Sequence, residues 1–264
     1  GAAAELAQVA GDAPGAGFTA AVLRGDALRA LGDPAGAAAA YESALALAPG
    51  LADSYLYERL GLARRDSGDL PGAQAAFQSA LAAPRVEPLP LRETLAGLYA
   101  AAGDDPAALA EYDAIFAAAA DDLTRARMDM LAGQTLARLG RAGESFARFR
   151  HAVETYPQTG DAYNALVALV DAGQPVGEYD RGLTDYYAGQ YPAAIAAFDR
   201  LLNAAPDEHP GAVHLYKAFS LREAGPPAAA VAELNSLIAT HPGDPILPEA
   251  WLELARTRWL WQDD

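Results

Sequence analysis

The sequence predicts an all-α protein, built as a solenoid of helical hairpins that repeat along the chain. Hydrophobic residues make up 52% of the 264 residues, and much of this fraction is alanine, which has the highest intrinsic helix propensity. Alternating β-branched runs, which would indicate strands, are absent. Glycines at predicted turns recur at steps of 36, 35, 37 and 33 residues, from Gly32 to Gly173. A period of about 34 residues is typical of helix–turn–helix repeats, each of which contacts mainly its neighbours.

Two hairpins are expected in the N-terminal part of the chain. Residues 1–10 have the composition of a helix end, and the glycines of segment 11–17 predict a loop after it. The first full hairpin is expected over residues 18–49, with its turn at Gly32 and a proline at its end. The second hairpin repeats this pattern around a turn at Gly68.

A longer connector separates these hairpins from the next two. Residues 84–90 contain three prolines, which are incompatible with a regular helix. The third hairpin is then expected to turn at Gly103 and the fourth at Gly140. In both, small and aromatic residues follow the turn at helical spacing, which predicts the second helix of each hairpin.

The period is broken once, after the fifth predicted turn. The step from Gly173 to Gly189 is only 16 residues, about half of one repeat, whereas the next step, to Gly225, is again 36. We therefore expect one extra helix near residues 161–172. The regular pattern resumes with a hairpin at residues 182–206.

The C-terminal segment differs from an ordinary terminal repeat. A helix is expected over residues 248–264, and it carries all three tryptophans, Trp251, Trp259 and Trp261. Terminal repeats normally have a polar outer face, so this apolar helix predicts a seventh repeat that is truncated within a longer solenoid. It also predicts self-association through these rings. Residues 1–264 are thus expected to form one solenoid of about six repeats.

Two hairpins carry a fuller signature of small, aromatic and proline residues at fixed spacing. Its members are Gly25, Gly32, Ala37, Tyr41, Ala44 and Pro49 in one hairpin, and Gly133, Gly140, Ser145, Phe149, Ala152 and Pro157 in another. This signature resembles the tetratricopeptide repeat family, over roughly residues 17–264, although the tryptophan often found early in the first helix is absent from most units. The resemblance implies a right-handed superhelix of paired antiparallel helices, whose first helices line a concave groove that holds a protein or peptide.

A second resemblance covers a smaller part of the chain. Residues 182–225, together with residues 241–261, are similar to the N-terminal helical superhelix of bacterial soluble lytic transglycosylases. This resemblance implies a non-catalytic arm that positions peptidoglycan glycan for a catalytic domain outside this chain, in the bacterial cell envelope and therefore outside the cytoplasm. The catalytic domain of those enzymes carries a Glu-Ser pair that is followed later by a Gly-Leu-Met-Gln-like stretch. In this sequence Glu144-Ser145 lies in a repeat turn, and no such stretch follows it. The sequence itself assigns no cellular location.

Composition argues against several partner classes. The net charge is −16, from 35 acidic and 19 basic residues, which disfavours nucleic acid and anionic membrane surfaces. No run of 18 apolar residues is present, so membrane insertion is not expected. The absence of cysteine excludes disulfides, thiolate zinc sites and cysteine nucleophiles.

Carboxylates and histidines are the candidate residues for catalysis or metal binding. The pairs Asp121-Asp122 and Asp263-Asp264 lie in a polar connector and at the end of the sequence, where they are interpreted as solvated or capping residues. Asp12, Asp33, Asp69 and Asp104 stand at turns or helix starts, where they are expected to cap backbone N–H groups. His151, His209, His214 and His241 show no helical metal-pair spacing. No catalytic, cofactor or metal site is therefore predicted, and the chain is expected not to be an enzyme.

The remaining candidate function is recognition of another molecule at the protein surface. The chain would act either as a scaffold for protein or peptide partners or as the enzyme arm described above. Side chains on the predicted first helices of the hairpins are the candidates for contact with a partner. They are Tyr179, Tyr186, Tyr187, Tyr216, Asn164, Arg59, Arg65, Gln134, Arg138 and Arg222. The tyrosines of residues 179–191 are the sharpest candidates. Alternatively, these rings pack around the break in the period.

Overall fold

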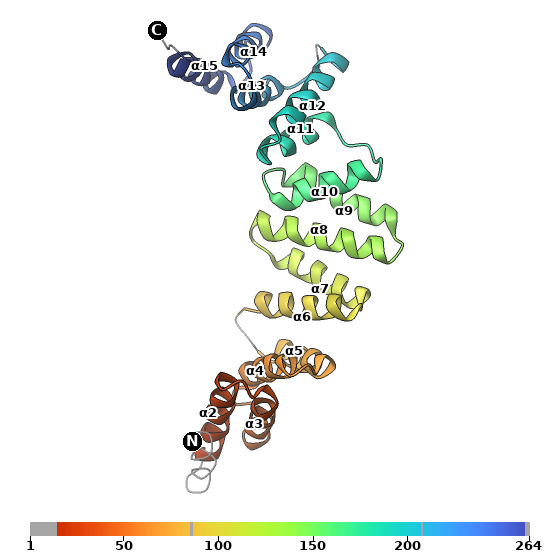
Figure 1. The fold of residues 1–264 in the computed structure, drawn as a ribbon, viewed down its shortest axis with the longest axis vertical. Helices are drawn as coiled ribbons and strands as arrows, with labels where there is room; N and C mark the ends of the chain where they lie inside the picture. The colour runs from red at the N-terminus through yellow and green to blue at the C-terminus, as the bar shows by residue number, and fades with distance from the viewer. Residues whose placement is uncertain (1–14, 85–86, 207, 262–264) are drawn as a thin grey trace. The chain divides into compact units, whose positions relative to one another are not determined.

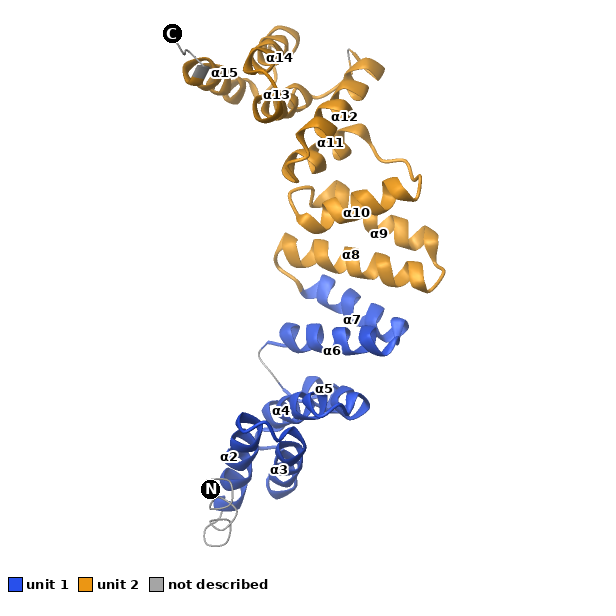
Figure 2. Ribbon diagram, in the orientation of Figure 1, with its two compact units in different colours: residues 1–118 blue, residues 119–264 orange. Residues whose placement is uncertain are grey.

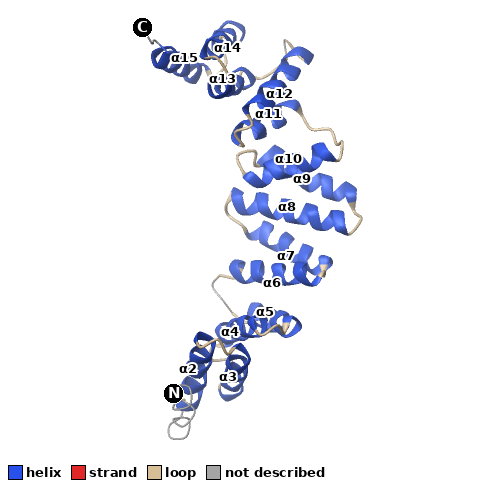
Figure 3. Ribbon diagram, viewed as in Figure 1, coloured by secondary structure: helices blue, strands red, loops and turns tan. Residues whose placement is uncertain are grey.

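A computed structural model describes residues 15–84, 87–206 and 208–261, and all regular structure in these residues is helical (Figure 1, Figure 3). The all-α fold expected from the sequence is confirmed. Two expectations, the helix at residues 1–10 and the pair Asp263-Asp264, lie outside the described residues. None of the described helices is both long enough and apolar enough to cross a bilayer.

The chain divides into two compact units, residues 1–118 and residues 119–264 (Figure 2). One continuous solenoid over residues 1–264 therefore stays a prediction. The described residues of unit 1 form three helical hairpins. They are α2 (Ala16–Ala30) with α3 (Pro34–Leu47), α4 (Asp53–Asp66) with α5 (Leu70–Ala82), and α6 (Leu89–Ala102) with α7 (Asp105–Ala118).

In unit 2, the part of the chain that the structure describes forms three further hairpins and two single helices. The hairpins are α8 (Asp122–Arg138) with α9 (Ala142–Thr155), α11 (Glu178–Tyr187) with α12 (Tyr191–Ala204), and α13 (Ala212–Ala224) with α14 (Pro227–Thr240). The single helices are α10 (Gly160–Asp171) and α15 (Leu247–Trp261). Helix α10 lies where the extra helix was expected. Its Leu166 and Leu169 pack with Phe149 and Val153 of α9 and with Met130 of α8 in one buried cluster.

Aspartates at the hairpin turns start several helices. Carboxylate oxygens of Asp33, Asp69 and Asp104 accept hydrogen bonds from the backbone N–H three residues later, at 2.9, 3.0 and 3.2 Å. Asp121 does the same with Thr124 at 2.8 Å, and these bonds lower the pKa of its carboxyl group. The predicted capping role of Asp33, Asp69 and Asp104 is therefore confirmed. Asp12 lies outside the described residues.

Four hairpins are closed by an aromatic ring that lies against a glycine of the preceding helix, sixteen residues earlier. The pairs are Gly25–Tyr41, Gly61–Phe77, Gly133–Phe149 and Gly182–Phe198. A Cβ atom on each glycine would lie 2.4–2.6 Å from a ring carbon, so the helices approach too closely for any larger residue there. The corresponding pairs in the other two hairpins are Ala96–Tyr112 and Ala218–Leu234, all of them buried.

Candidate functional site

An aromatic cluster lies on α11 and α13, the first helices of two successive hairpins, and includes one ring at the start of α12. We call it the tyrosine patch, and it consists of Tyr179, Tyr186, Tyr187, Tyr191, Tyr216 and Phe219. Tyr186 is central, because its ring centroid lies 5.2 Å from those of both Tyr187 and Tyr216 and 6.0 Å from that of Phe219. The fold thus brings together four residues that the sequence predicted as partner-binding, Tyr179, Tyr186, Tyr187 and Tyr216.

The rings of the tyrosine patch have a buried side and an exposed side. Tyr179, Tyr186 and Tyr216 pack against the buried core residues Ala194, Phe198 and Val213 of α12 and α13. Tyr187 is 46% exposed, and its hydroxyl lies 3.2 Å from the hydroxyl of Tyr216. Packing against the core thus accounts for the buried faces of Tyr179, Tyr186 and Tyr216, whereas the ring of Tyr187 is accessible.

Burial raises the pKa of three tyrosines of the patch, Tyr179, Tyr186 and Tyr216. Burial is the first cause that raises the pKa of Tyr186 and Tyr179 above the usual value of 10.0. For Tyr216 the pKa is raised further, first by burial and then by the hydrogen bond with Tyr187. These three tyrosines therefore keep uncharged hydroxyl groups at physiological pH.

The predicted arginines are used within the chain. Arg59 donates to Asp26 at 2.7 Å, across the two hairpins of α2 and α4, and its guanidinium lies 4.7 Å from the centre of the Tyr55 ring. Arg222 donates to Glu253 of α15 at 2.7 Å and lies over Phe219, beside the tyrosine patch. Arg65 donates to its neighbour Asp66 at 2.8 Å.

The other three predicted residues lie on different helices from the tyrosine patch. Gln134 and Arg138 are exposed on α8, where Arg138 donates to the Thr135 hydroxyl at 3.0 Å. Asn164 is exposed on α10. Their role in partner binding stays a prediction.

A cavity lies beside α10, at the break in the period. Its volume is about 230 Å³, and its lining comes from α10, α11 and α12, including Tyr163, Val170, Arg181, Asp185 and Ala193. Asp185 is only 5% exposed, and its Oδ2 makes no hydrogen bond among the described residues. Burial raises the pKa of Asp185 to about 6, although Arg181, with Nε 3.9 Å from Oδ2, and Arg200 oppose this change.

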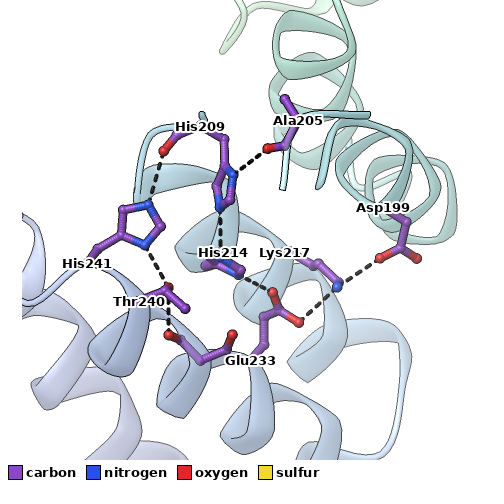
Figure 4. A network of polar contacts seen from close by, with 9 residues as sticks. Asp199, Ala205, His209, His214, Lys217, Glu233, Thr240 and His241 are labelled. Atoms are coloured by element: carbon purple, nitrogen blue, oxygen red, sulfur yellow. Dashed lines mark hydrogen bonds and ion pairs between the residues drawn. The ribbon is translucent and has the colours of Figure 1, made fainter. Parts of the chain in front are cut away.

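Three histidines of unit 2 meet in the structure, although the sequence shows no helical metal-pair spacing among them (Figure 4). We call His209, His214 and His241 the histidine cluster. One ring nitrogen from each lies within 4.8 Å of one from each of the others. His209 and His241 stand in successive connectors, 32 residues apart, so the stacking of repeats superposes them. Spacing within a single helix does not reveal this kind of contact.

Another buried ionic group lies between α8 and α9. Asp129 is fully buried and accepts hydrogen bonds from Arg148 at 3.1 Å and from Nδ1 of His151 at 2.6 Å. Such a group, fully paired, connects the two helices of the hairpin. Its position inside the hairpin favours a structural role.

Comparisons with known proteins identify the repeats. Residues 18–50 and residues 179–245 match family models described as tetratricopeptide repeat. No curated protein matches the chain. These matches do not test the similarity to lytic transglycosylases, which stays a prediction.

Solved structures that match the chain share little sequence with it. A tetratricopeptide repeat protein from Parabacteroides merdae is 16% identical, with a TM-score of 0.46 and 94% of each chain covered. The C-terminal part of a TPR repeat-containing protein from Cytophaga hutchinsonii is 17% identical, with a TM-score of 0.39, covering 90% of this chain and 88% of that one. The TPR2AB domain of yeast Sti1, in a complex with pHSP90, is 15% identical, with a TM-score of 0.35, covering 92% and 99%.

Proposed function

Because the chain carries tetratricopeptide repeats, we propose that it is a non-catalytic module that binds a protein or peptide partner through the tyrosine patch. The observation that carries this proposal is the accessible ring of Tyr187, placed on an aromatic cluster between the first helices of two successive hairpins. Tyrosine is enriched at protein interfaces because it combines a large apolar ring with a hydroxyl that can form hydrogen bonds.

The chemistry of the patch favours an extended partner segment with apolar and basic side chains. Apolar side chains would pack on the ring of Tyr187, and its hydroxyl pair with Tyr216 could bond to a peptide backbone. A Lys or Arg side chain would be attracted to the faces of the tyrosine rings. The net charge of −16 would also steer a basic segment towards the chain.

The proposal is tested by selecting peptides from a displayed random library against the full chain and measuring their affinity by fluorescence anisotropy. We expect Tyr187→Ala to weaken binding about ten-fold or more, as is typical of a central aromatic contact. Tyr55→Ala is the matched control, because Tyr55 is 43% exposed and belongs to unit 1, whereas the tyrosine patch belongs to unit 2. Equal affinities for both variants would exclude the tyrosine patch as the binding surface.

A further inference from the structure

The histidine cluster is held together by contacts between two connectors. His241, which ends α14, donates from Nε2 to the carbonyl oxygen of His209 at 3.0 Å. The N–H of Gly211 donates to Asp244 at 3.1 Å, and a Cβ atom on Gly211 would lie 2.5 Å from that carboxylate oxygen. The α12–α13 connector therefore lies directly against the α14–α15 connector.

In two of the histidines, the hydrogen bonds place the ring proton on Nδ1, so that Nε2 is unprotonated and carries a lone pair. His209 lies with Nδ1 2.8 Å from the carbonyl oxygen of Ala205, which can only accept, so Nδ1 carries the proton. His214, which is buried, has Nδ1 against a carboxylate oxygen of Glu233, which also accepts. In each neutral ring the proton is thus on Nδ1 and the lone pair on Nε2.

These two lone pairs point at one another. Figure 4 draws the contact between the Nε2 atoms of His209 and His214. These atoms are 3.0 Å apart, and two acceptors at this distance repel unless a cation lies between them. With Zn–N bonds of about 2.0–2.1 Å, two ligand nitrogens in a tetrahedral site lie about 3.3 Å apart. The observed separation is close to this value.

His241 supplies the third nitrogen. Its Nδ1 lies 2.8 Å from the hydroxyl of Thr240, which itself donates to the carbonyl oxygen of Ser236 at 2.8 Å. The ring centroids of His209 and His241 are 5.0 Å apart, and those of His214 and His241 are 5.5 Å apart. To bind a metal ion, His241 would have to give up the hydrogen bond of one ring nitrogen and release the proton of that nitrogen. Its ring would also have to move slightly.

The groups that accept hydrogen bonds from the Nδ1 atoms of His209 and His214 are of the kind that orient metal-binding histidines. In metal sites the second ring nitrogen usually donates to a carboxylate or a backbone carbonyl, which fixes the orientation of the ring. Glu233 does this for His214, and the carbonyl of Ala205 does it for His209. Glu233 is itself held by Lys217 at 2.8 Å, and Lys217 is held by Asp199 at 2.8 Å.

We propose that His209, His214 and His241 bind one divalent transition-metal ion. Zinc fits best, because it prefers imidazole ligands and tetrahedral geometry, and three protein ligands leave a fourth position for water or for a side chain of a partner. The ion would join the α12–α13 connector to the end of α14 and so hold two successive hairpins in a fixed arrangement. This site is separate from the tyrosine patch and does not depend on the function proposed above.

The test is metal titration of the full chain after treatment with a chelator. By calorimetry we expect one Zn²⁺ per chain, with a heat that depends on the buffer because binding releases protons. Cobalt is the spectroscopic probe, and we expect a tetrahedral Co²⁺ absorption band from the wild-type chain and no such band from the variant that lacks all three histidines. His209→Ala and His241→Ala should each weaken Zn²⁺ binding at least ten-fold. Glu233→Gln should weaken it about 10- to 100-fold, through the orientation of His214.

His151→Ala is the matched control, because this fourth histidine contacts Asp129 on α8 and does not belong to the cluster. Its Zn²⁺ affinity should equal that of the wild type. The proposal is overturned if His151→Ala loses as much affinity as His209→Ala. It is also overturned if the wild type gives no tetrahedral Co²⁺ band and binds Zn²⁺ no more tightly than the variant that lacks all three histidines. In that case the cluster shares a proton instead of a metal ion.

Discussion

Gly182 on α11 lies so close to Phe198 on α12 that a Cβ atom on Gly182 would be 2.5 Å from Cε1 of the ring. The ring is fully buried and could move only by displacing its core neighbours, among them Ala194 and Val213. The same relationship recurs in three other hairpins. In the α13–α14 hairpin, Ala218 instead faces Leu234.

Gly182→Ala is therefore expected to destabilise the protein. Overpacking costs about 1–3 kcal/mol, and the better helix propensity of alanine offsets about 1 kcal/mol of this, so we expect a net loss of up to about 2 kcal/mol in the free energy of unfolding. Chemical denaturation measures it. Gly97→Ala is the control, because Gly97 lies in α6 with no atom within 4 Å of its added Cβ, and it should be stabilising by about 0.5–1 kcal/mol.

A second substitution separates overpacking from other causes. Because Ala218 and Leu234 form a natural alanine–leucine pair, Phe198→Leu should recover part of the stability lost in Gly182→Ala. If the double variant is no more stable than the sum of the two single effects predicts, the close contact is not the reason for the glycine.

The hairpins could be predicted from the sequence because their signals are local. Turn glycines, capping aspartates such as Asp33 and the small-to-aromatic spacing all lie within one repeat. The candidate sites depend on contacts between repeats. Asp26 and Arg59 are 33 residues apart, and His209 and His241 are 32 apart, about one period. Periodicity within a helix gives no sign of such pairs, although a search for partners one repeat away would have found them.

Asp185→Asn should stabilise the protein at pH 7. Burial raises the pKa of Asp185 from 3.8 to about 6, so between pH 4 and pH 6 the folded state binds more protons than the unfolded state. Stability should then rise as pH falls from 7 towards 5, because the cost of the buried carboxylate disappears. The pKa difference corresponds to at most about 3 kcal/mol, and loss of the partner of Arg181 reduces the expected gain for the variant to about 1–2 kcal/mol at pH 7.

Unfolding measured at pH 7, 6 and 5 checks this prediction. The difference between Asp185→Asn and the wild type should shrink as pH falls. Asp121→Asn is the control, since the pKa of this exposed capping carboxyl is lowered and its contribution is lost only below pH 4. A constant difference for Asp185→Asn from pH 7 to pH 5 would show that Asp185 does not titrate in this range.

Asp26→Asn should loosen the contact between the first two hairpins. One carboxylate oxygen of Asp26 accepts from Arg59 and from the hydroxyl of Tyr41, each at 2.7 Å. Burial, followed by the bond to Asp26, raises the pKa of Tyr41 to about 12. Loss of the charge weakens both bonds, and we expect a destabilisation of about 1–2 kcal/mol together with a lower pKa of Tyr41. Tyrosinate absorbance during an alkaline titration reports that pKa, and an unchanged value would contradict the prediction.

The apolar face of α15 predicts self-association. Trp251 is 56% exposed and Trp259 is 77% exposed, and Leu252 and Leu260 beside them are also exposed. Several large apolar side chains on one helix form a surface that a second molecule would cover, whereas a single exposed leucine such as Leu31 is ordinary. Light scattering should show a mass that increases with protein concentration. Trp259→Glu should reduce this increase, and Leu31→Glu should leave it unchanged. A wild-type chain that stays monomeric at high concentration would contradict the prediction.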